Sequence, residues 1–301
     1  MGQSRPEFSG LAIALLCGVV LGTAVVVSRF AYDAGASGVV VAISRTIVMT
    51  TAFFFVLKIM RRSLRVPKKL LLMSLVNGVL MGIMTFGNIG AVEFIPIGLA
   101  SLLFFTFPII IAILVIAFRI EHVTWPKVLA IIVAFVGIAT MLGDSVGEVD
   151  GRGVALALMG ATATAVNAIL VGRYFKGVDV LVMTFYFSIG AFVFLLILAA
   201  TIAEVRYPQT PIGWGGVVGV AILQSIGTPL YFYAIAKIGA LKTGIAAKIQ
   251  PVTSVLEAWL VFDEVLAILQ ALGGALVLAG IGFMQWADFK ARRKLEENLA
   301  K

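Results

Sequence analysis

The sequence predicts an all-α integral membrane protein whose ten transmembrane helices form two inverted repeats of five helices each. Three observations lead to this fold class: the composition, the number of long apolar segments, and a residue pattern that occurs twice at one spacing. Hydrophobic residues make up 61% of the 301-residue chain, charged residues make up 13%, and the mean hydropathy is +1.10. Soluble domains are about half apolar and about one quarter charged, so this chain would expose too much apolar surface in water.

Ten apolar segments account for most of the chain. A bilayer core needs about 20 apolar residues per helix, and charged or Pro/Gly-rich breaks divide the chain into segments of this length. The connections between them are too short for a further domain. The first segment is expected to be a retained helix, because no small-residue cleavage site follows it. The expected helices cover residues 9–31, 37–58, 69–92, 96–118, 124–143, 152–173, 179–203, 212–236, 240–262 and 266–288.

The distribution of lysine and arginine predicts the orientation of these helices, because cytoplasmic loops carry an excess of both. With the N-terminus in the cytoplasm, all but five of the 23 lysines and arginines fall on the cytoplasmic side. Arg29, Arg152 and Arg206 fall outside, and Arg45 and Lys248 lie within helices. Both termini are therefore predicted to be cytoplasmic. The net charge of +8 follows from this topology and does not indicate nucleic-acid binding.

A proline–glutamate–glycine pattern occurs once in each half of the chain. Pro108, Glu121 and Gly137 recur as Pro251, Glu264 and Gly280, always 143 residues later. Five helices per repeat is an odd number, so the second repeat must enter the membrane in the opposite direction. We therefore predict a first repeat over residues 1–143 and an inverted second repeat, with a short basic cytoplasmic tail, over 144–301. Proline-interrupted helices at matching positions of two halves are a pointer to the substrate site of a secondary transporter.

These residues resemble the drug/metabolite transporter superfamily, and in particular its EamA-type exporters. The resemblance is carried by the two Pro–Glu–Gly patterns, with Phe107-Pro108-Ile109-Ile110 in the first half and Gln250-Pro251-Val252-Thr253 in the second. It extends over essentially the whole chain. It implies export of small amphipathic metabolites, amino acids and aromatic ones among them, across a bacterial inner membrane. Multidrug carriers and nucleotide- or sugar-type carriers are the alternatives within the same class.

The two prolines are expected to break their helices beside the substrate. Each lacks an N–H, so Pro108 leaves the carbonyl of Phe104, and Pro251 that of Ala247, without its helical partner. At membrane depth such a carbonyl needs another partner, and a cavity can supply one. A plain kink, satisfied by a neighbouring helix, is the alternative interpretation.

Polar side chains also form matching stripes on the third helix of each repeat. Asn77, Met81, Thr85 and Asn88 fall along one helical face, and a shift of 143 residues turns the last three into Gln224, Thr228 and Tyr231. Interhelical hydrogen bonding is the simpler alternative, but the doubled stripe favours the lining of a cavity. The predicted substrate-binding residues are Thr23, Asn77, Met81, Thr85, Asn88, Phe104, Asn167, Gln224, Thr228, Tyr231, Lys248 and Gln250.

Ionisable residues within the predicted helices are functional candidates, because a charge in the bilayer is costly. Lys248 is a candidate contact for a substrate carboxylate, and snorkelling to the cytoplasmic surface is its alternative role. Glu257 is a candidate proton-linked site. The two lie on opposite sides of their helix and cannot pair. Arg45, near the outer end of its helix, is expected to be a structural anchor.

The residue inventory argues against an enzyme. The single histidine, His122, and the single cysteine, Cys17, supply neither a metal site nor a nucleophile–base pair within the bilayer. No P-loop is present, so direct ATP coupling and a cofactor are not expected. A channel fits inverted repeats with broken helices less well than a carrier does. The expected partners are a small-molecule substrate and the lipid bilayer, without nucleic acid, and the chain is expected to act as a monomer by facilitated diffusion rather than proton antiport.

Overall fold

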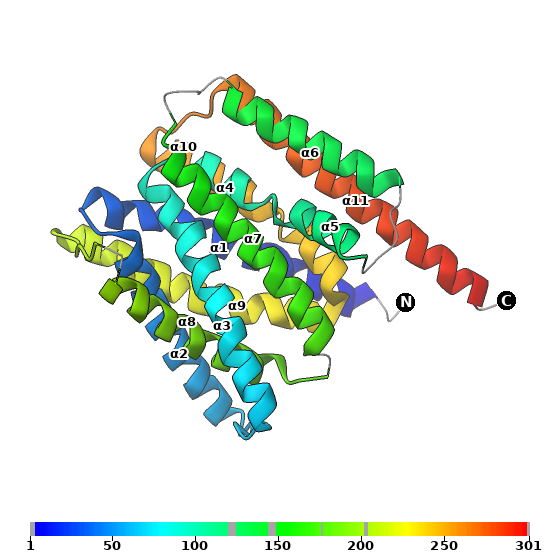
Figure 1. Ribbon diagram of the computed structural model, residues 1–301, viewed down its shortest axis with the longest axis horizontal. Helices are drawn as coiled ribbons and strands as arrows, with labels where there is room; N and C mark the ends of the chain where they lie inside the picture. Colours follow the sequence, from blue (N-terminus) through cyan, green and yellow to red (C-terminus); the bar gives the residue numbers. More distant parts are fainter. Residues whose placement is uncertain (1–3, 120–124, 144–148, 176, 202–203, 300–301) are drawn as a thin grey trace.

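The computed structural model describes residues 4–119, 125–143, 149–175, 177–201 and 204–299. Within these ranges the chain is helical and contains no strand, which confirms the predicted all-α class (Figure 1). The helices are α1 (Ser4–Asp33), α2 (Gly38–Ile59), α3 (Lys68–Gly90), the short 3₁₀ helix η1 (Ala91–Glu93), α4 (Ile97–Phe104), α5 (Phe107–Ala117), α6 (Trp125–Gly143), α7 (Gly151–Tyr174), α8 (Val180–Thr201), α9 (Pro211–Ala246), α10 (Ile249–Phe262) and α11 (Ile268–Leu299).

Seven helical stretches among the described residues are long and apolar enough to cross a membrane. Three shorter apolar helices accompany them, at Val128–Thr140, Ile249–Phe262 and Ile268–Met284. Each of the ten predicted segments overlaps one of these stretches, so the chain is a multi-pass membrane protein. The number of complete crossings and the cytoplasmic position of the termini stay predictions.

Polar residues set several of the helix ends. Asp150 caps α7, because its carboxylate accepts the backbone N–H of Arg152 at 2.8 Å. Asp263 ends α10 with a left-handed backbone (φ 54°), which aspartate tolerates better than most residues do. These ends place charged side chains outside the apolar segments.

The fourth predicted helix is broken into α4 and α5. The interruption covers Phe105 and Thr106, and Pro108 lies in the first turn of α5, where its missing N–H removes no internal helical bond. The ninth is interrupted at Ala247 and Lys248, just before Pro251 in the first turn of α10. The carbonyl of Ala247 accepts the N–H of Gln250 at 3.0 Å, so a tighter turn replaces the helical bond that the proline removes.

One predicted boundary differs from the structure. The gap expected between 236 and 240 does not end a helix, because helical backbone continues to Ala246 without a proline to stop it. The chain nevertheless reverses direction there, since both Gly227 and Gln250 lie beside the same turn of α1. Helix α1 therefore has an antiparallel neighbour in the first part of α9 and a parallel one in α10.

Helices α6 and α11 pack together along one edge of the molecule, with α2 and α8 at the opposite edge (Figure 1). A Cβ on Gly137 would lie 2.6 Å from the carbonyl oxygen of Gly273, and one on Gly280 would lie 3.1 Å from that of Ala130. These contacts show that α6 and α11 run antiparallel. The two contacts are also equivalent by the repeat. Adding 143 residues converts Ala130 into Gly273 and Gly137 into Gly280, so each contact joins the same two repeat positions.

Candidate functional site

The polar stripe of α3 is buried. Asn77, Met81, Thr85 and Asn88 are each less than 9% exposed, and they line neither of the two pockets described below. Asn77 is 3% exposed, and neither the oxygen nor the nitrogen of its amide has a hydrogen-bond partner among the described residues. A buried amide that makes no hydrogen bonds lowers the stability of the protein. This face of α3 therefore has a donor and an acceptor available for hydrogen bonds in the conformation described.

The matching polar stripe of α9 is only partly buried. Gln224 is buried, whereas Thr228 and Tyr231 are half-buried. Asn167 is half-buried on α7. Phe104 packs instead in an aromatic cluster with Phe105 and Phe107, whose ring centroids lie 5.8–6.1 Å apart.

Two of the predicted residues are brought together from opposite repeats. The hydroxyl of Thr23 in α1 lies 2.7 Å from a carboxylate oxygen of Glu257 in α10, and 3.0 Å from the carbonyl oxygen of Val19. A hydroxyl has one hydrogen, so it can donate to only one of these acceptors at a time. The Thr23 hydroxyl therefore either links α1 to α10 through Glu257 or bonds to its own helix at Val19.

Gln250 and Lys248 lie at the break before α10. Gly22 of α1 packs against this turn, because a Cβ there would lie 2.7 Å from the carbonyl oxygen of Gln250. The amino group of Lys248 lies 3.7 Å from the position of a Cβ on Gly282, so its side chain reaches towards α11. Lys248 is thereby directed to a different helix from the polar stripes of α3 and α9.

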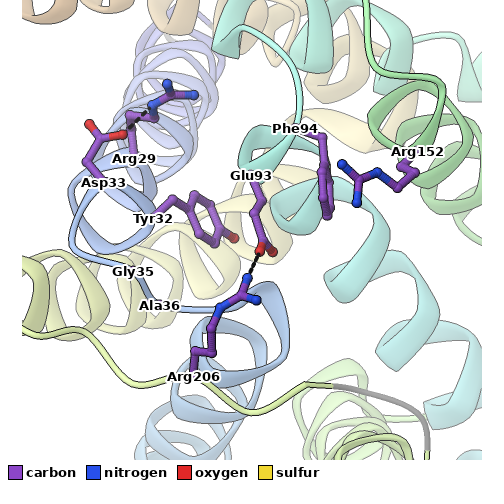
Figure 2. A pocket seen from close by; sticks show the side chains of 9 residues that line it. All are labelled: Arg29, Tyr32, Asp33, Gly35, Ala36, Glu93, Phe94, Arg152 and Arg206. Carbon is purple, nitrogen blue, oxygen red and sulfur yellow. Dashed lines mark hydrogen bonds and ion pairs between the residues drawn. The ribbon is translucent and has the colours of Figure 1, made fainter.

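The more polar of the two pockets described here is one that the sequence did not predict. It has a volume of about 380 Å³ and lies where α1, η1, α7 and the segment before α9 meet (Figure 2). We call this the outer pocket, after its position in the predicted orientation. Its lining residues are Arg29, Tyr32, Asp33, Gly35, Ala36, Glu93, Phe94, Arg152 and Arg206.

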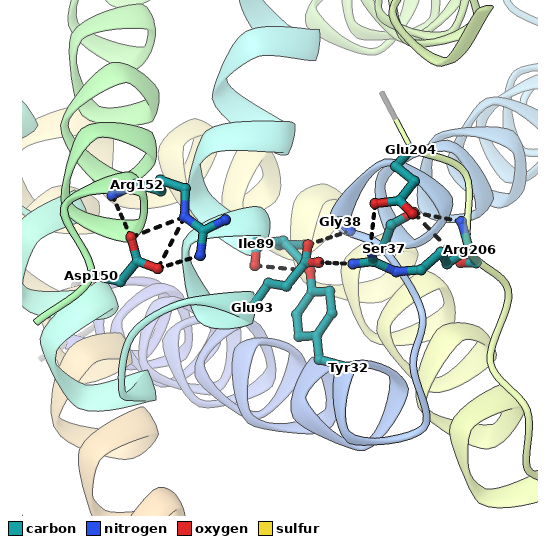
Figure 3. A network of polar contacts seen from close by, with 9 residues as sticks. All are labelled: Tyr32, Ser37, Gly38, Ile89, Glu93, Asp150, Arg152, Glu204 and Arg206. Carbon is teal, nitrogen blue, oxygen red and sulfur yellow. Dashed lines mark hydrogen bonds and ion pairs between the residues drawn. The ribbon is translucent and has the colours of Figure 1, made fainter. Parts of the chain in front are cut away.

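A polar network links the two repeats at this end of the molecule (Figure 3). Arg206 pairs with Glu93 at 2.7 Å, and the same carboxylate accepts the N–H of Gly38 at 2.9 Å. The backbone of Ser37 donates to the carbonyl of Arg206 at 2.9 Å, and Tyr32 donates to that of Ile89 at 2.9 Å. We call these contacts the outer seal.

Arg152 completes the rim of the pocket. Its guanidinium stacks on the ring of Phe94, 4.5 Å from the centroid, and its hydrogen bonds to Asp150 hold the pKa of that carboxyl below its usual value. The three arginines here, Arg29, Arg152 and Arg206, are the ones that depart from the predicted cytoplasmic excess of positive charge. That departure was the only signal in the sequence that pointed to this pocket.

Glu264, the glutamate of the second Pro–Glu–Gly pattern, contacts the first turn of α4. Glu264 accepts the first N–H of α4, from Ile97, at 2.8 Å and lies 4.0 Å from Arg29. Burial raises the pKa of Glu264 above its ordinary value, although the bond from Ile97 opposes this effect. Its counterpart Glu121, like His122, lies outside the described residues.

A second pocket is apolar and lies between α4, α10 and α11. It has a volume of about 640 Å³, and Pro251 lines it together with Leu102, Trp259 and Leu278. The described residues contain no cluster of three or more histidine, cysteine, aspartate or glutamate side chains that could hold a metal ion.

Arg45 is the ionisable residue that the sequence suggested as a structural anchor. The side chain is buried in α2, and its Nε and Nη1 atoms have no hydrogen-bond partner within the described part of the chain. An anchor would hold an acidic or carbonyl group, and these two nitrogens hold neither.

Comparisons with known proteins support the repeat directly. The model of the EamA-like transporter family matches the chain twice, over residues 8–143 and 151–286. The two matches start 143 residues apart (151−8), the same shift that relates the Pro–Glu–Gly patterns. The chain is 24% identical over 262 residues to the uncharacterized transporter YoaV of Bacillus subtilis (strain 168), covering 83% of this chain and 87% of that protein. A crystal structure with 19% identity superposes with a TM-score of 0.64, covering 95% of this chain and 98% of the other, which shows a common fold.

Proposed function

Because the chain belongs to the EamA-like transporter family and is a membrane transporter, we propose that it exports small amphipathic metabolites by alternating access. Amino acids, including aromatic ones, are the favoured substrates. The membrane is that of a bacterial cell, as for the related Bacillus transporter. The chain then works as two inverted repeats, 1–143 and 144–301, and the reciprocal packing of Gly137 and Gly280 supports this division.

The observation that carries the proposal is the buried polar surface between the repeats. The stripe of Asn77, Met81, Thr85 and Asn88 is enclosed, and the amide of Asn77 has no partner. Polar groups inside a membrane protein commonly face a substrate pathway, and unpaired ones gain free energy when a solute supplies the missing bonds. The aromatic cluster around Phe104 offers apolar surface for the side chain of such a solute.

The outer seal supports alternating access in particular. Arg206 and Glu93 belong to different repeats, so opening this end requires their pair to separate. In the proposed cycle, the conformation described is the one that these contacts hold closed at that end. Movement of one repeat against the other would break the seal and expose the buried stripe to the outer side.

Proton antiport is the second candidate, and the Thr23–Glu257 contact favours it. A carboxyl that exchanges hydrogen-bond direction with a hydroxyl can hold a proton in one state and lose it in another. Facilitated diffusion remains the favoured mode, because few other titratable side chains lie within the predicted helices.

Uptake by liposomes that contain the purified protein tests the function. Radiolabelled amino acids are offered as a panel, with and without an imposed pH gradient. Saturable uptake without the gradient is the expected result. Uptake that needs the gradient and is lost in Glu257→Gln would replace facilitated diffusion by proton exchange, and no uptake of any amino acid would remove the amino-acid assignment.

A further inference from the structure

Arg45 is a charged side chain in the interior of the molecule, and two of its three guanidinium nitrogens have no hydrogen-bond partner among the described residues. Only 5% of the residue is exposed, and the two nitrogens are Nε and Nη1. Arginine keeps its charge under physiological conditions, so burial does not neutralise it. An unpaired buried charge is among the costliest features that a protein can retain, which suggests that another molecule supplies its partner.

One hydrophobic cluster shows which helices lie beside α2 near Arg45. Val41 of α2, Ile89 of α3 and Val220 of α9 belong to this cluster, with Tyr32 of α1 packed against it. Helices α2 and α9 both start at the outer seal, and α3 ends there. One turn further from the seal, these three helices carry Arg45, Thr85 and Gln224.

Three buried polar side chains therefore lie at one depth on three helices. Thr85 is 2% exposed and Gln224 is 4% exposed, so the whole layer is enclosed. Thr85 and Gln224 belong to the polar stripes that the sequence predicts to contact substrate. We call Arg45, Thr85 and Gln224 the polar layer.

The polar layer is close to the outer pocket. Tyr32 lines that pocket and donates its hydroxyl to the carbonyl of Ile89, in the cluster directly outside the layer. Tyr32 therefore lies between the polar layer and the outer pocket.

We propose that Arg45 binds the carboxylate of the transported solute, with Thr85 and Gln224 at the same depth to contact its remaining polar groups. This assignment deepens the proposed export function and rests on it. A planar guanidinium with free N–H groups matches a carboxylate better than a neutral or cationic group. The substrates are then amino acids or other small carboxylates, and cationic drugs are excluded.

Lys248 fits this role less well. Its amino group reaches towards Gly282 of α11, away from the helices that form the polar layer. The carboxylate contact that the sequence suggested for Lys248 is therefore assigned to Arg45.

The test compares Arg45→Met, Arg45→Lys and the matched exposed control Arg65→Met. Without ligand, Arg45→Met should melt at the same temperature as the wild type or higher, because it removes an unpaired buried charge. In liposomes, its uptake of L-phenylalanine should fall at least tenfold, with partial activity in Arg45→Lys and wild-type activity in Arg65→Met. Unlabelled L-phenylalanine should compete with wild-type uptake far better than L-phenylalaninamide, which lacks the carboxylate.

Thermal shifts separate this proposal from the proposed function. If the wild type takes up no amino acid, melting is compared with and without L-phenylalanine, benzoate and acetate. Stabilisation of the wild type and Arg45→Lys by a carboxylate, but not of Arg45→Met, would support the Arg45 site even then. The proposal is overturned if no carboxylate stabilises the wild type, or if Arg45→Met is destabilised without ligand and still prefers L-phenylalanine to its amide.

Discussion

At the scale of single residues, the repeated Pro–Glu–Gly pattern supports the architecture at each position that the structure describes. Pro251 lies in the first turn of α10, Glu264 caps α4, and Gly137 and Gly280 let α6 approach α11. The sequence alone suggested that these residues mark a substrate site. In the structure, these residues contribute to the packing of the two repeats. Contact with a substrate is proposed for the side chains around them.

Glu264 should make stability depend on pH. Burial raises its pKa above 4.5, so the folded protein binds the proton more tightly than the unfolded chain does. The stabilising contribution is fully present below pH 4.5 and is lost as pH rises through the raised pKa. As pH increases from 4 towards neutrality, the melting temperature of the wild type should therefore fall relative to that of Glu264→Gln. A difference that stays constant, or moves in its favour, would contradict this assignment.

Gln224 and Tyr231 test the predicted lining of the pathway. Replacing either by alanine should lower the uptake rate by about tenfold, equivalent to about 1.4 kcal/mol of lost interaction. Folded yield should be unchanged, because the proposed role of both side chains is to contact the solute rather than to stabilise the fold. Thr162→Ala is the control, since Thr162 is exposed on α7 and bonds only to its own helix at Leu158. Wild-type uptake in both variants would remove these residues from the lining.

At the scale of helices, close backbone approach explains the seam between α6 and α11. Apolar segments in lipid gain little from burial against one another, so they associate where small residues allow tight packing. Gly137 and Gly280 provide this at equivalent positions. The same principle applies where Gly78 of α3 packs against the backbone of α8 at Phe187.

Gly137→Ala should destabilise the protein by about 1–3 kcal/mol, the usual cost of overpacking. The added Cβ would lie 2.6 Å from the carbonyl oxygen of Gly273 and 2.9 Å from Val277, and backbone cannot move aside easily. Gly172→Ala is the matched control, because a Cβ there meets nothing within 4 Å. Thermal melting should fall for the first variant and stay the same or rise slightly for the second. Equal melting of both would show that the seam is not tight.

The order and type of the helices were predictable, whereas their breaks were only partly so. Lipid requires long apolar runs to be helical, so composition alone indicates such helices strongly. The end expected near residue 236 was only partly right, because helical backbone continues to Ala246 although the chain turns back in this region. Proline positions indicated the other breaks to within a few residues.

At the scale of the whole molecule, the candidate site was less predictable than the fold. Thr85 and Gln224 could be found because their stripe repeats along one helix face and again in the second half. Arg45 has no polar partner on its own face, and Glu93 and Arg206 are far apart in the sequence. Only the tertiary arrangement brings the latter two together in the outer seal.

The central claim is that the two repeats separate at the outer seal during each transport cycle. Ala34 and Gln209 come from different repeats, and the N–H of Gln209 donates to the carbonyl of Ala34 at 2.8 Å. A disulfide needs Cα atoms within about 7 Å of each other, a range that hydrogen-bonded backbones can meet. Ala34→Cys and Gln209→Cys are therefore combined with Cys17→Ala, which removes the one native thiol.

Liposome uptake of this double-cysteine protein, before and after reduction, is the most direct measurement. The oxidised protein should transport almost nothing, and a reductant should restore uptake to the level of the Cys17→Ala background. Either single-cysteine variant should respond to neither treatment. Undiminished uptake with the disulfide demonstrably formed would contradict alternating access through this end of the molecule.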